Sequence, residues 1–392
     1  MSALFTCSHP TRVILIRHAR STFNQMGRYQ GSSDEAVLTE AGLEAARKTG
    51  REIASLGIDA IYTSRLTRVR QTTAEMLTEI AAVRHALPEL IEDDRLREID
   101  LHAWQGLTYT EVRQRYATDY RCWVERPHEF QVLAQPEPSG SAIATLAPSN
   151  SADSTFARRP VLDLYARVER FWPDLLARHA GKTVAIVSHS GTIRAAIGTA
   201  LGIPPARFHL LQQSNCGISQ LAFAPNSSIA QLETLNLTEH LGETLPKTKE
   251  GKQGVRLLLV AAKTVDDAQA IALSRRWRDI DLDFCLSEAG AAAWTAHRVL
   301  ADRPATTRYF YDSADRPDWD RTLDRQRDLA AKSGRFLTGA IVASEAYVRD
   351  RLSRYFGSSA SVWQPHPGAF SVLHHPHADR LPSIQALNIP TY

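Results

Sequence analysis

The first half of the chain contains three short apolar runs that each end on polar residues, the pattern of strands buried inside a sheet. These runs are residues 13–16, 60–62 and 183–187. Between and after them, apolar residues recur at steps of three and four, which predicts amphipathic helices. The alternation of strands and helices predicts an α/β fold with a doubly wound, mostly parallel sheet.

Hydroxyl side chains mark the expected starts of two of these helices. Thr39 can cap a helix whose apolar positions recur from Leu43 to Ile53, and Ser64 can cap the helix that follows the second strand. The apolar stripe of this second helix leaves Arg68 near the helix N-terminus, pointing away from the core. Polar residues 17–22 and 188–191 directly follow predicted strands, at the edge where doubly wound sheets bind their ligands.

Two changes in composition divide the chain. Residues 131–158 are rich in Pro, Ser, Ala, Gly and Thr and have no periodicity, which predicts a loop or mobile lid. Residues 244–253 carry Lys and Gly without apolar periodicity, so we interpret them as a linker. The expected parts are therefore a catalytic domain over residues 1–243 and a second domain over residues 254–392.

The second domain resembles the first in three segments that follow in the same order. Residues 255–259 resemble the first strand, and residues 286–290 match residues 38–42. Residues 341–342, followed by Val348, Arg349 and Gly357, match residues 186–187, Ile193, Arg194 and Gly202. In this alignment Leu259, Val260 and Ser344 stand opposite Arg17, His18 and His189. We therefore expect a degenerate second copy that lacks the chemistry and takes the place of a second subunit, as an intrachain pseudo-dimer.

Composition excludes several classes of protein. A hydrophobic content of 43% is too high for a disordered chain, and the balance of 46 Lys and Arg against 43 Asp and Glu gives no large field to attract nucleic acid or a membrane surface. The longest apolar run, residues 257–262, is far shorter than a membrane span. The four cysteines stand singly, without metal-site spacing, so we expect a cytoplasmic or similarly reducing compartment.

Five segments resemble the histidine phosphatase (phosphoglycerate mutase-like) superfamily. They are Leu15-x-Arg17-His18 through Asn24; Gln30-Gly31 with Leu38-Thr39-x-x-Gly42; Ser64-x-Leu66-x-Arg68-x-x-Gln71-Thr72; Leu96-x-Glu98 through Trp104-Gln105-Gly106; and Val187-Ser188-His189-Ser190-Gly191. Further segments, such as residues 211–217, look like the plant phosphatases of 2-carboxy-D-arabinitol 1-phosphate and their bacterial relatives. The resemblance implies a phosphoglycerate mutase-like fold and a phosphatase of a small phosphorylated sugar or sugar acid, or of a sugar bisphosphate. It leaves a mutase as the alternative enzyme, and a noncatalytic sensor or scaffold as the alternative of another class.

Phosphoester hydrolysis requires a nucleophile, cationic donors for the phosphoryl oxygens and a proton donor for the leaving group. We expect His18 to attack phosphorus, Glu98 to act as acid and then base, and His189 to donate to the phosphoryl group. The expected phosphate-binding residues are Arg17, Arg68 and Asn24. The expected substrate-binding residues are Arg20, Gln30, Gly31 and Ser190, with Arg28 beside Arg20. Two arginines already supply the positive charge, so we expect no metal and no cofactor, and the only partner expected is the phosphate ester itself.

Other residues have a plainer interpretation. Arg70 lies about 200° around its helix from Arg68, which favours a surface role, whereas His102 either packs in a loop or lines the substrate pocket. His374, His375 and His377 suggest a metal site, but Pro376 between them favours an exposed tail. The sequence shows no base that could activate the thiol of Cys216, so we do not expect it to be catalytic. Ala19 replaces the Gly that usually follows the nucleophilic histidine, so its methyl group restricts the backbone there.

Overall fold

The computed structural model describes residues 8–133, 157–249, 251–262, 265–312, 316–357, 362–376 and 381–391. The first half contributes six strands to a large sheet: β1 (Thr11–Arg17), β2 (Ala60–Thr63), β3 (Glu89–Glu92), β6 (Thr183–Ser188), β7 (Ile218–Phe223) and β8 (Gln231–Leu237). Its α-helices are α1 (Thr22–Met26), α2 (Glu40–Ile53), α3 (Thr67–Ala81), α4 (Tyr109–Arg115), α5 (Ala117–Glu125), α6 (Pro160–Glu169), α7 (Trp172–Arg178) and α8 (Ser190–Leu201). Single 3-10 turns are η1 (Ala54–Leu56), η2 (Asp94–Leu96), η3 (His102–Trp104), η4 (Pro205–Arg207) and η5 (Glu239–Leu241), and β4 (Val132–Leu133) pairs with β5 (Ala157–Arg158).

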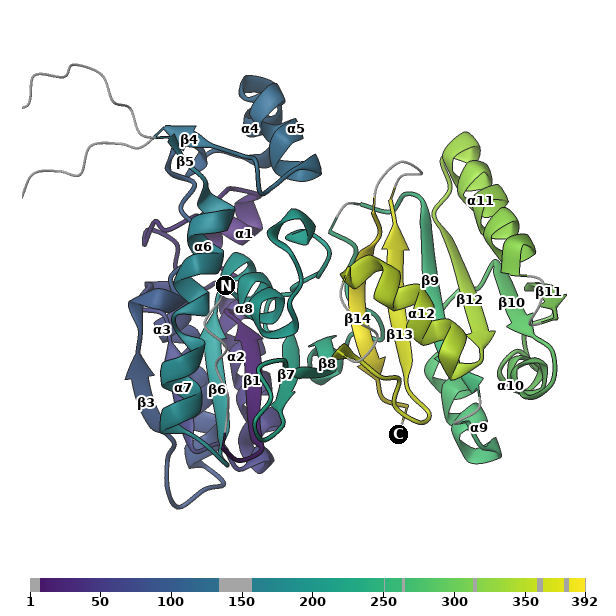
Figure 1. The fold of residues 1–392 in the computed structure, drawn as a ribbon, viewed down its shortest axis with the longest axis horizontal. Coiled ribbons are helices and arrows are strands. Elements are labelled where there is room, and N and C mark those ends of the chain that lie inside the picture. The colour runs from purple at the N-terminus through teal and green to yellow at the C-terminus, as the bar shows by residue number, and fades with distance from the viewer. Residues whose placement is uncertain are drawn as a thin grey trace, which may run out of the picture.

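The second half supplies the remaining strands of the same sheet. They are β9 (Val255–Ala261), β10 (Phe284–Glu288), β11 (Thr307–Tyr311), β12 (Leu337–Ala343), β13 (Phe370–His375) and β14 (Ser383–Ile389). Its helices are α9 (Asp267–Arg276), α10 (Ala291–Val299), α11 (Arg316–Ser333) and α12 (Glu345–Phe356). The strand order across the sheet is β11-β10-β12-β9-β13-β14-β8-β7-β1-β6-β2-β3, so each half of the chain builds one half of the sheet (Figure 1).

The predicted α/β fold is confirmed for the first half. Helices cover both faces of this doubly wound sheet: on β1, Val13 and Leu15 pack in the core that includes α6, α7 and α8, while Ile14 and Ile16 pack against α2 and α3. The pairs at the two ends of the sheet are parallel, as predicted. The pairs in its centre are antiparallel, because β7–β8 and β13–β14 are hairpin-like pairs that the sequence pattern did not reveal.

One of the two expected helix caps is confirmed. The Thr39 hydroxyl accepts a hydrogen bond from the Gly42 N–H at 3.1 Å and caps α2. Ser64 is not the N-cap of α3. The N-cap is Leu66, whose side chain makes no capping hydrogen bond. Arg68 does not reach solvent, because the loop at residues 31–33 covers it and leaves it fully buried.

The two halves share one strand order. Read from the edge inward, the first half runs β3-β2-β6-β1-β7-β8 and the second β11-β10-β12-β9-β13-β14. The β1–β6 pair ends at Arg17 and Ser188, whereas the β9–β12 pair ends at Ala261 and Ala343. The antiparallel neighbours give the same correspondence, because the first residue of β7 pairs with Ile16 and the first residue of β13 pairs with Val260.

This register corrects two details of the sequence alignment. Ala261 and Ala262, not Leu259 and Val260, stand opposite Arg17 and His18, so the alignment was two residues out of step. The match of residues 286–290 to residues 38–42 is wrong, because the former include the end of strand β10 and the latter lead into helix α2. In each half a 12-residue helix ends at a left-handed glycine, and its N-cap is His189 in the first half and Ser344 in the second.

The halves meet at β8 and β14, where Leu235 pairs with Leu387. Both are the fifth residue of a seven-residue strand, so each faces its own counterpart. The next residues repeat the relation: Asn236 Nδ2 donates to the Gln385 carbonyl and Asn388 Nδ2 to the Glu233 carbonyl, both at 2.7 Å. The contact therefore has the reciprocal form of a twofold interface.

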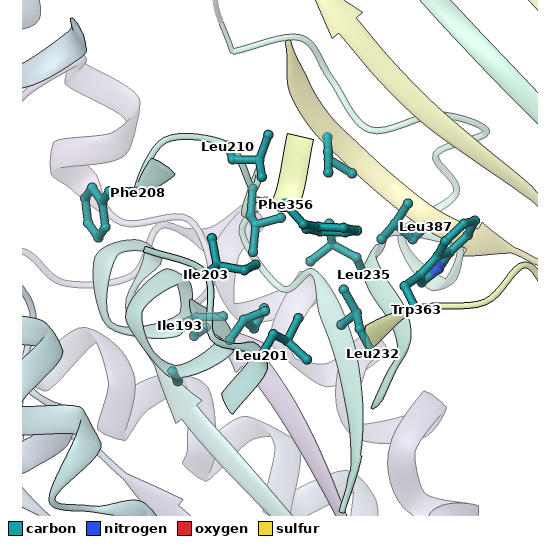
Figure 2. Close-up of a cluster of buried hydrophobic side chains, with 14 of the residues drawn as sticks. Ile193, Leu201, Ile203, Phe208, Leu210, Leu232, Leu235, Phe356, Trp363 and Leu387 are labelled. Carbon is teal, nitrogen blue, oxygen red and sulfur yellow. The ribbon is translucent and has the colours of Figure 1, made fainter. Parts of the chain in front are cut away.

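Apolar side chains from both halves close this interface. Figure 2 shows Leu232 and Leu235 of β8 beside Leu387, Phe356 and Trp363 of the second half. All five are buried and belong to one continuous hydrophobic cluster. The two halves thus share a core as well as a sheet.

The other expectations concern the lid, the linker, the histidine cluster and membrane spans. Most of the predicted lid over residues 131–158 lies outside the described residues, and the described part of residues 244–253 contains no helix or strand. His374 and His375 are not an exposed tail: both are buried on β13, a central strand between β9 and β14, whereas His377 lies outside the described residues. No described helix is long and apolar enough to cross a bilayer.

Candidate active site

His18 follows the carboxyl end of β1 and is 2% exposed. Its Nδ1 lies 2.8 Å from the Ala19 carbonyl oxygen, which can only accept, so Nδ1 carries the proton. In the neutral ring, Nε2 then carries the free electron pair. Burial, with the neighbouring cations Arg17 and Arg68, holds the pKa of His18 well below its ordinary value of 6.5. The imidazole of His18 is therefore uncharged at neutral pH.

Two buried guanidinium groups flank this imidazole. Arg17 at the end of β1 donates from Nη1 to the Gln213 carbonyl at 2.9 Å, and Arg68 in the first turn of α3 donates to the carbonyls of Ser33 and Gly31. Burial lowers the pKa of both, that of Arg68 to about 10, and leaves both charged at neutral pH. The Nε atom of each is buried without a hydrogen-bond partner in the described structure.

His189 stands at the N-terminus of α8, with its ring centroid 5.3 Å from that of His18. Its Nε2 lies 2.9 Å from the Ser64 hydroxyl, whereas its Nδ1 is buried without a partner among the described residues. When Ser64 donates to Nε2, the neutral ring carries its proton on Nδ1, as a free donor. Burial and the charge of Arg68 hold the pKa of His189 well below 6.5.

Glu98 is half-buried and caps the N-terminus of α8. Its carboxylate accepts the N–H groups of Gly191 at 3.1 Å and Thr192 at 3.2 Å, a position that the helix dipole favours for an anion. Its negative charge acts on Arg17 and on Arg68. Glu98 therefore lies close enough to both cations for its charge to raise their pKa values.

Asn24 and Gln30 position the site through a shared network. The Ser21 hydroxyl donates to Gln30 Oε1 at 2.8 Å, and Asn24 Oδ1 accepts from the Ser21 N–H. Asn215 Nδ2 joins Asn24 Oδ1 to the carbonyl oxygen of His18. Asn24 thus fixes the loop around His18.

Gly31 is required where it stands. Its φ is +50°, a left-handed value, and a Cβ there would lie 2.7 Å from the Gln105 side chain. Its carbonyl oxygen accepts from Arg68 Nη2 at 2.9 Å. Gly31 therefore shapes the loop that holds this guanidinium.

The remaining candidates are exposed or only partly buried. Arg20 has an exposed side chain, while Ser190, the first residue of α8, is half-buried. Arg28 donates to the Gly106 carbonyl. His102 is partly buried, with Nδ1 4.0 Å from Asp100 Oδ1, and Arg70 is an exposed partner of Glu92, as its surface interpretation predicted.

The structure shows the surroundings of Ala19 and Cys216, the two residues whose effect on the site was open from the sequence. Ala19 is buried, and its φ is not in the left-handed region that would require glycine, so its methyl group does not strain the loop. Its N–H donates to the Thr72 hydroxyl at 3.0 Å. Burial raises the pKa of the Cys216 thiol to about 12, which keeps it protonated and unreactive.

Several residues contribute to the site in ways that the sequence analysis did not predict. Ser64, read as a helix cap, orients His189 instead, and Thr72 ties the loop after β1 to α3. Asn215 holds the His18 carbonyl, and the Gln213 carbonyl receives Arg17. Ser64 and Thr72 belong to a segment already matched to the superfamily, and residues 211–217 to a second one, so the motifs carried the signal.

Within the described ranges, no group of three or more His, Cys, Asp and Glu side chains could hold a metal ion. The cluster instead presents a neutral imidazole, two cations and three unpartnered nitrogen atoms: Nε of Arg17, Nε of Arg68 and Nδ1 of His189. Such donors suit the oxygens of a phosphoryl group. Chemically, the arrangement can bind a tetrahedral anion and attack it with a nitrogen nucleophile.

Comparison with known proteins gives the following matches. Residues 13–238, more than half of the chain, match the model of the histidine phosphatase superfamily (branch 1). Phosphoserine phosphatase 1 of Hydrogenobacter thermophilus is 33% identical over 234 residues, 59% of this chain and 95% of its own length. The 2-carboxy-D-arabinitol-1-phosphatase of Triticum aestivum is 32% identical over 253 residues, 64% of this chain.

The match covers only 45% of the wheat protein, so this chain spans about half the length of that relative. Among solved structures, a mycobacterial glucosyl-3-phosphoglycerate phosphatase is 22% identical, with a TM-score of 0.45 over 58% of this chain and 99% of the other.

Proposed function

Because the chain belongs to branch 1 of the histidine phosphatase superfamily, we propose that it hydrolyses a small phosphate ester with His18 as the nucleophile. The substrate class is a phosphorylated sugar or sugar acid, such as 2-carboxyarabinitol 1-phosphate, or a sugar bisphosphate. The resemblance of residues 211–217 and the similarity to the wheat enzyme favour this class.

The observation that carries the proposal is the set of unpartnered donors around a neutral His18. Buried polar atoms in folded proteins are almost always hydrogen-bonded, so three such nitrogen atoms beside one nucleophile indicate a ligand that accepts from all of them. A phosphoryl group has three oxygens for this purpose. Arg17 and Arg68 also neutralise its charge.

The reaction then has two steps. Nε2 of His18 attacks phosphorus, the ester P–O bond breaks, and Glu98 in its protonated form gives its proton to the leaving alkoxide oxygen. Water next attacks the phosphohistidine, the P–N bond breaks, and ionised Glu98 takes a proton from that water. Inorganic phosphate leaves, and both His18 and Glu98 return to their starting states.

We propose further that residues 1–243 form the catalytic domain, residues 244–253 the linker and residues 254–392 a degenerate copy that acts as an intrachain second subunit. The shared strand order and the reciprocal bonds of Asn236 and Asn388 support this division. The counterparts of Arg17 and His18 are Ala261 and Ala262, which can neither bind nor attack a phosphoryl group.

We also propose that the protein works in a reducing compartment such as the cytoplasm. Cys122, Cys216 and Cys285 are free thiols, and the last two are buried. A thiol titration of the freshly isolated protein that found a disulfide would contradict this.

The experiment for the proposed function is a phosphate-release screen over phosphorylated sugar acids, sugar bisphosphates, neutral sugar monophosphates and phosphoserine. We expect release from at least one of them by the wild-type chain and none by His18→Ala. His9→Ala, at an exposed histidine, is the matched control and should retain full activity. Release by neither protein would leave a noncatalytic role, and an isomeric phosphate ester in place of inorganic phosphate would identify a mutase.

A further inference from the structure

A cavity of about 160 Å³ lies where the two halves meet. The first half contributes Tyr29 and Arg194 to its lining, and the second half contributes His374 and Ser383. Lys249, from the segment that connects the halves, also lines it. The second half therefore helps to build a cavity that neither half forms alone.

Lys249 joins this cavity to the buried cluster around His18. Its Nζ donates to the carbonyl oxygen of Gln213, which also accepts from Arg17 Nη1 at 2.9 Å. One acceptor thus holds the ammonium beside the guanidinium. Lys249 as a residue is exposed, so its stem meets solvent while the ammonium reaches inward.

The charges around Lys249 are mainly positive. Burial and the cations Arg17 and Arg194 hold its pKa well below the ordinary value of 10.5, and only the charge of Glu98 opposes them. The same ammonium acts on His18. Three cations held this close together repel one another, and an anionic ligand relieves that repulsion.

Arg17 and Arg68 already provide for the phosphoryl group through their unpartnered Nε atoms. Lys249 is therefore available for a different group of the same ligand. A primary ammonium with three donors on a flexible stem suits a carboxylate or a second phosphate.

We propose that Lys249 binds a second anionic group of the substrate, so that the segment between the halves determines which phosphate esters the site accepts. The inference rests on the proposed function, because it places the scissile phosphoryl group at His18. It gives the second half a role in recognition, because that half lines the cavity at which Lys249 stands.

The test compares two esters that differ in one group: 3-phosphoglycerate, with a carboxylate, and the glycerol phosphate of the same configuration, with a hydroxymethyl group. We expect the wild-type chain to prefer 3-phosphoglycerate. Lys249→Ala should lower kcat/KM for 3-phosphoglycerate by about 10- to 100-fold, the usual range for a lost charged hydrogen bond, and change that for glycerol phosphate less than threefold. Lys249→Arg should retain most of the preference.

Lys247→Ala is the matched control. This lysine lies in the same segment, but its side chain is 87% exposed and pairs with Glu243. It should leave both values unchanged. An equal loss on both esters in Lys249→Ala would place the ammonium on the scissile phosphoryl group instead, and no loss on either would remove Lys249 from recognition. Both results overturn the proposal.

A binding measurement separates this inference from the proposed function. Calorimetric titration of both esters into wild-type and Lys249→Ala protein should show the same loss, for 3-phosphoglycerate alone. If the chain releases no phosphate but the binding difference holds, the proposed function fails and Lys249 keeps its assignment. Equal affinities in the two proteins, or no binding of either ester, would overturn it.

Discussion

Replacement of Glu98 by Gln separates the proton-transfer role of this carboxylate from its structural one. In the structure Oε1 accepts the N–H of Ile99 at 2.9 Å and that of Thr192 at 3.2 Å, while Oε2 accepts the N–H of Gly191 at 3.1 Å. The Gln carbonyl can replace Oε1, but its NH₂ group would face the Gly191 donor.

The structural cost of this change can be worked out from those contacts. One unsatisfied buried donor costs about 1–3 kcal/mol, and loss of the charge at the helix N-terminus adds about 0.3–1 kcal/mol. Since domains are stable by roughly 5–15 kcal/mol, the variant should remain folded. Loss of the acid and base should slow turnover by about 10² to 10⁴-fold.

The assay is steady-state phosphate release, with thermal unfolding measured beside it. Glu111→Gln is the control, because Glu111 also accepts a backbone N–H at a helix N-terminus, that of Thr108 at 2.7 Å, but is a surface capping residue of α4. It should stay folded and lose no activity.

A good leaving group makes the test sharper. With p-nitrophenyl phosphate, whose leaving group needs no proton, the first step should stay fast in Glu98→Gln while water attack stays slow, so one equivalent of p-nitrophenol should appear in a burst. Turnover equal to wild type, or the same loss in every step with no burst, would refute the assignment of Glu98.

Four further predictions follow from the same structure. EDTA should leave phosphate release unchanged, because Arg17 and Arg68 supply the positive charge; loss of activity that Mg²⁺ restores would contradict the mechanism. The pKa values of His18 and His189 are held below 6.5, so the unfolded chain binds protons at a higher pH than the folded chain does. The free energy of unfolding should therefore fall as the pH drops below about 6.5, by up to about 1.4 kcal/mol per pH unit for each histidine. The slope should be smaller in His18→Ala. Asn388→Ala should lower the free energy of unfolding by about 2–4 kcal/mol, because the Asn388 amide donates to the carbonyls of Glu233 and Gln364 and its φ of +55° disfavours alanine; an unchanged unfolding midpoint would remove it from the interface. If Arg20 binds the second anionic group together with Lys249, Arg20→Ala should lower kcat/KM for a sugar bisphosphate, relative to that for a neutral sugar monophosphate, by about 10-fold or more. An unchanged ratio would leave that role to Lys249 alone.

The sequence predicted three of the first-half strands, β1, β2 and β6, and the helices α2, α3 and α8, because their signals are local. Residues 13–16 form part of β1 and residues 183–187 part of β6, and the motifs at their ends meet where the parallel strands end side by side. The sequence therefore placed His18 and His189 in the same site. Parallel strands bring the residues at their carboxyl ends together at one edge of the sheet.

Contacts between distant segments had no such local signal. The two histidines at 374 and 375 resembled a tail because Pro376 follows them, yet antiparallel pairing with β9 buries them. The alignment of Leu259 with Arg17 slipped by two residues because a run of apolar residues fixes a strand but not its register. Lys249 could not be assigned to the site from its linker composition, because its contact with the Gln213 carbonyl depends on how the two halves pack.

The proposed transfer of the phosphoryl group to His18 can be tested by trapping the phosphohistidine. A reaction with ³²P-labelled substrate, quenched in alkali to preserve phosphohistidine, would be digested and the labelled peptide sequenced. We expect label on His18 in the wild-type chain, more label in Glu98→Gln because water attack is slowed, and none in His18→Ala. Turnover with the label on another residue, or turnover by His18→Ala itself, would contradict it.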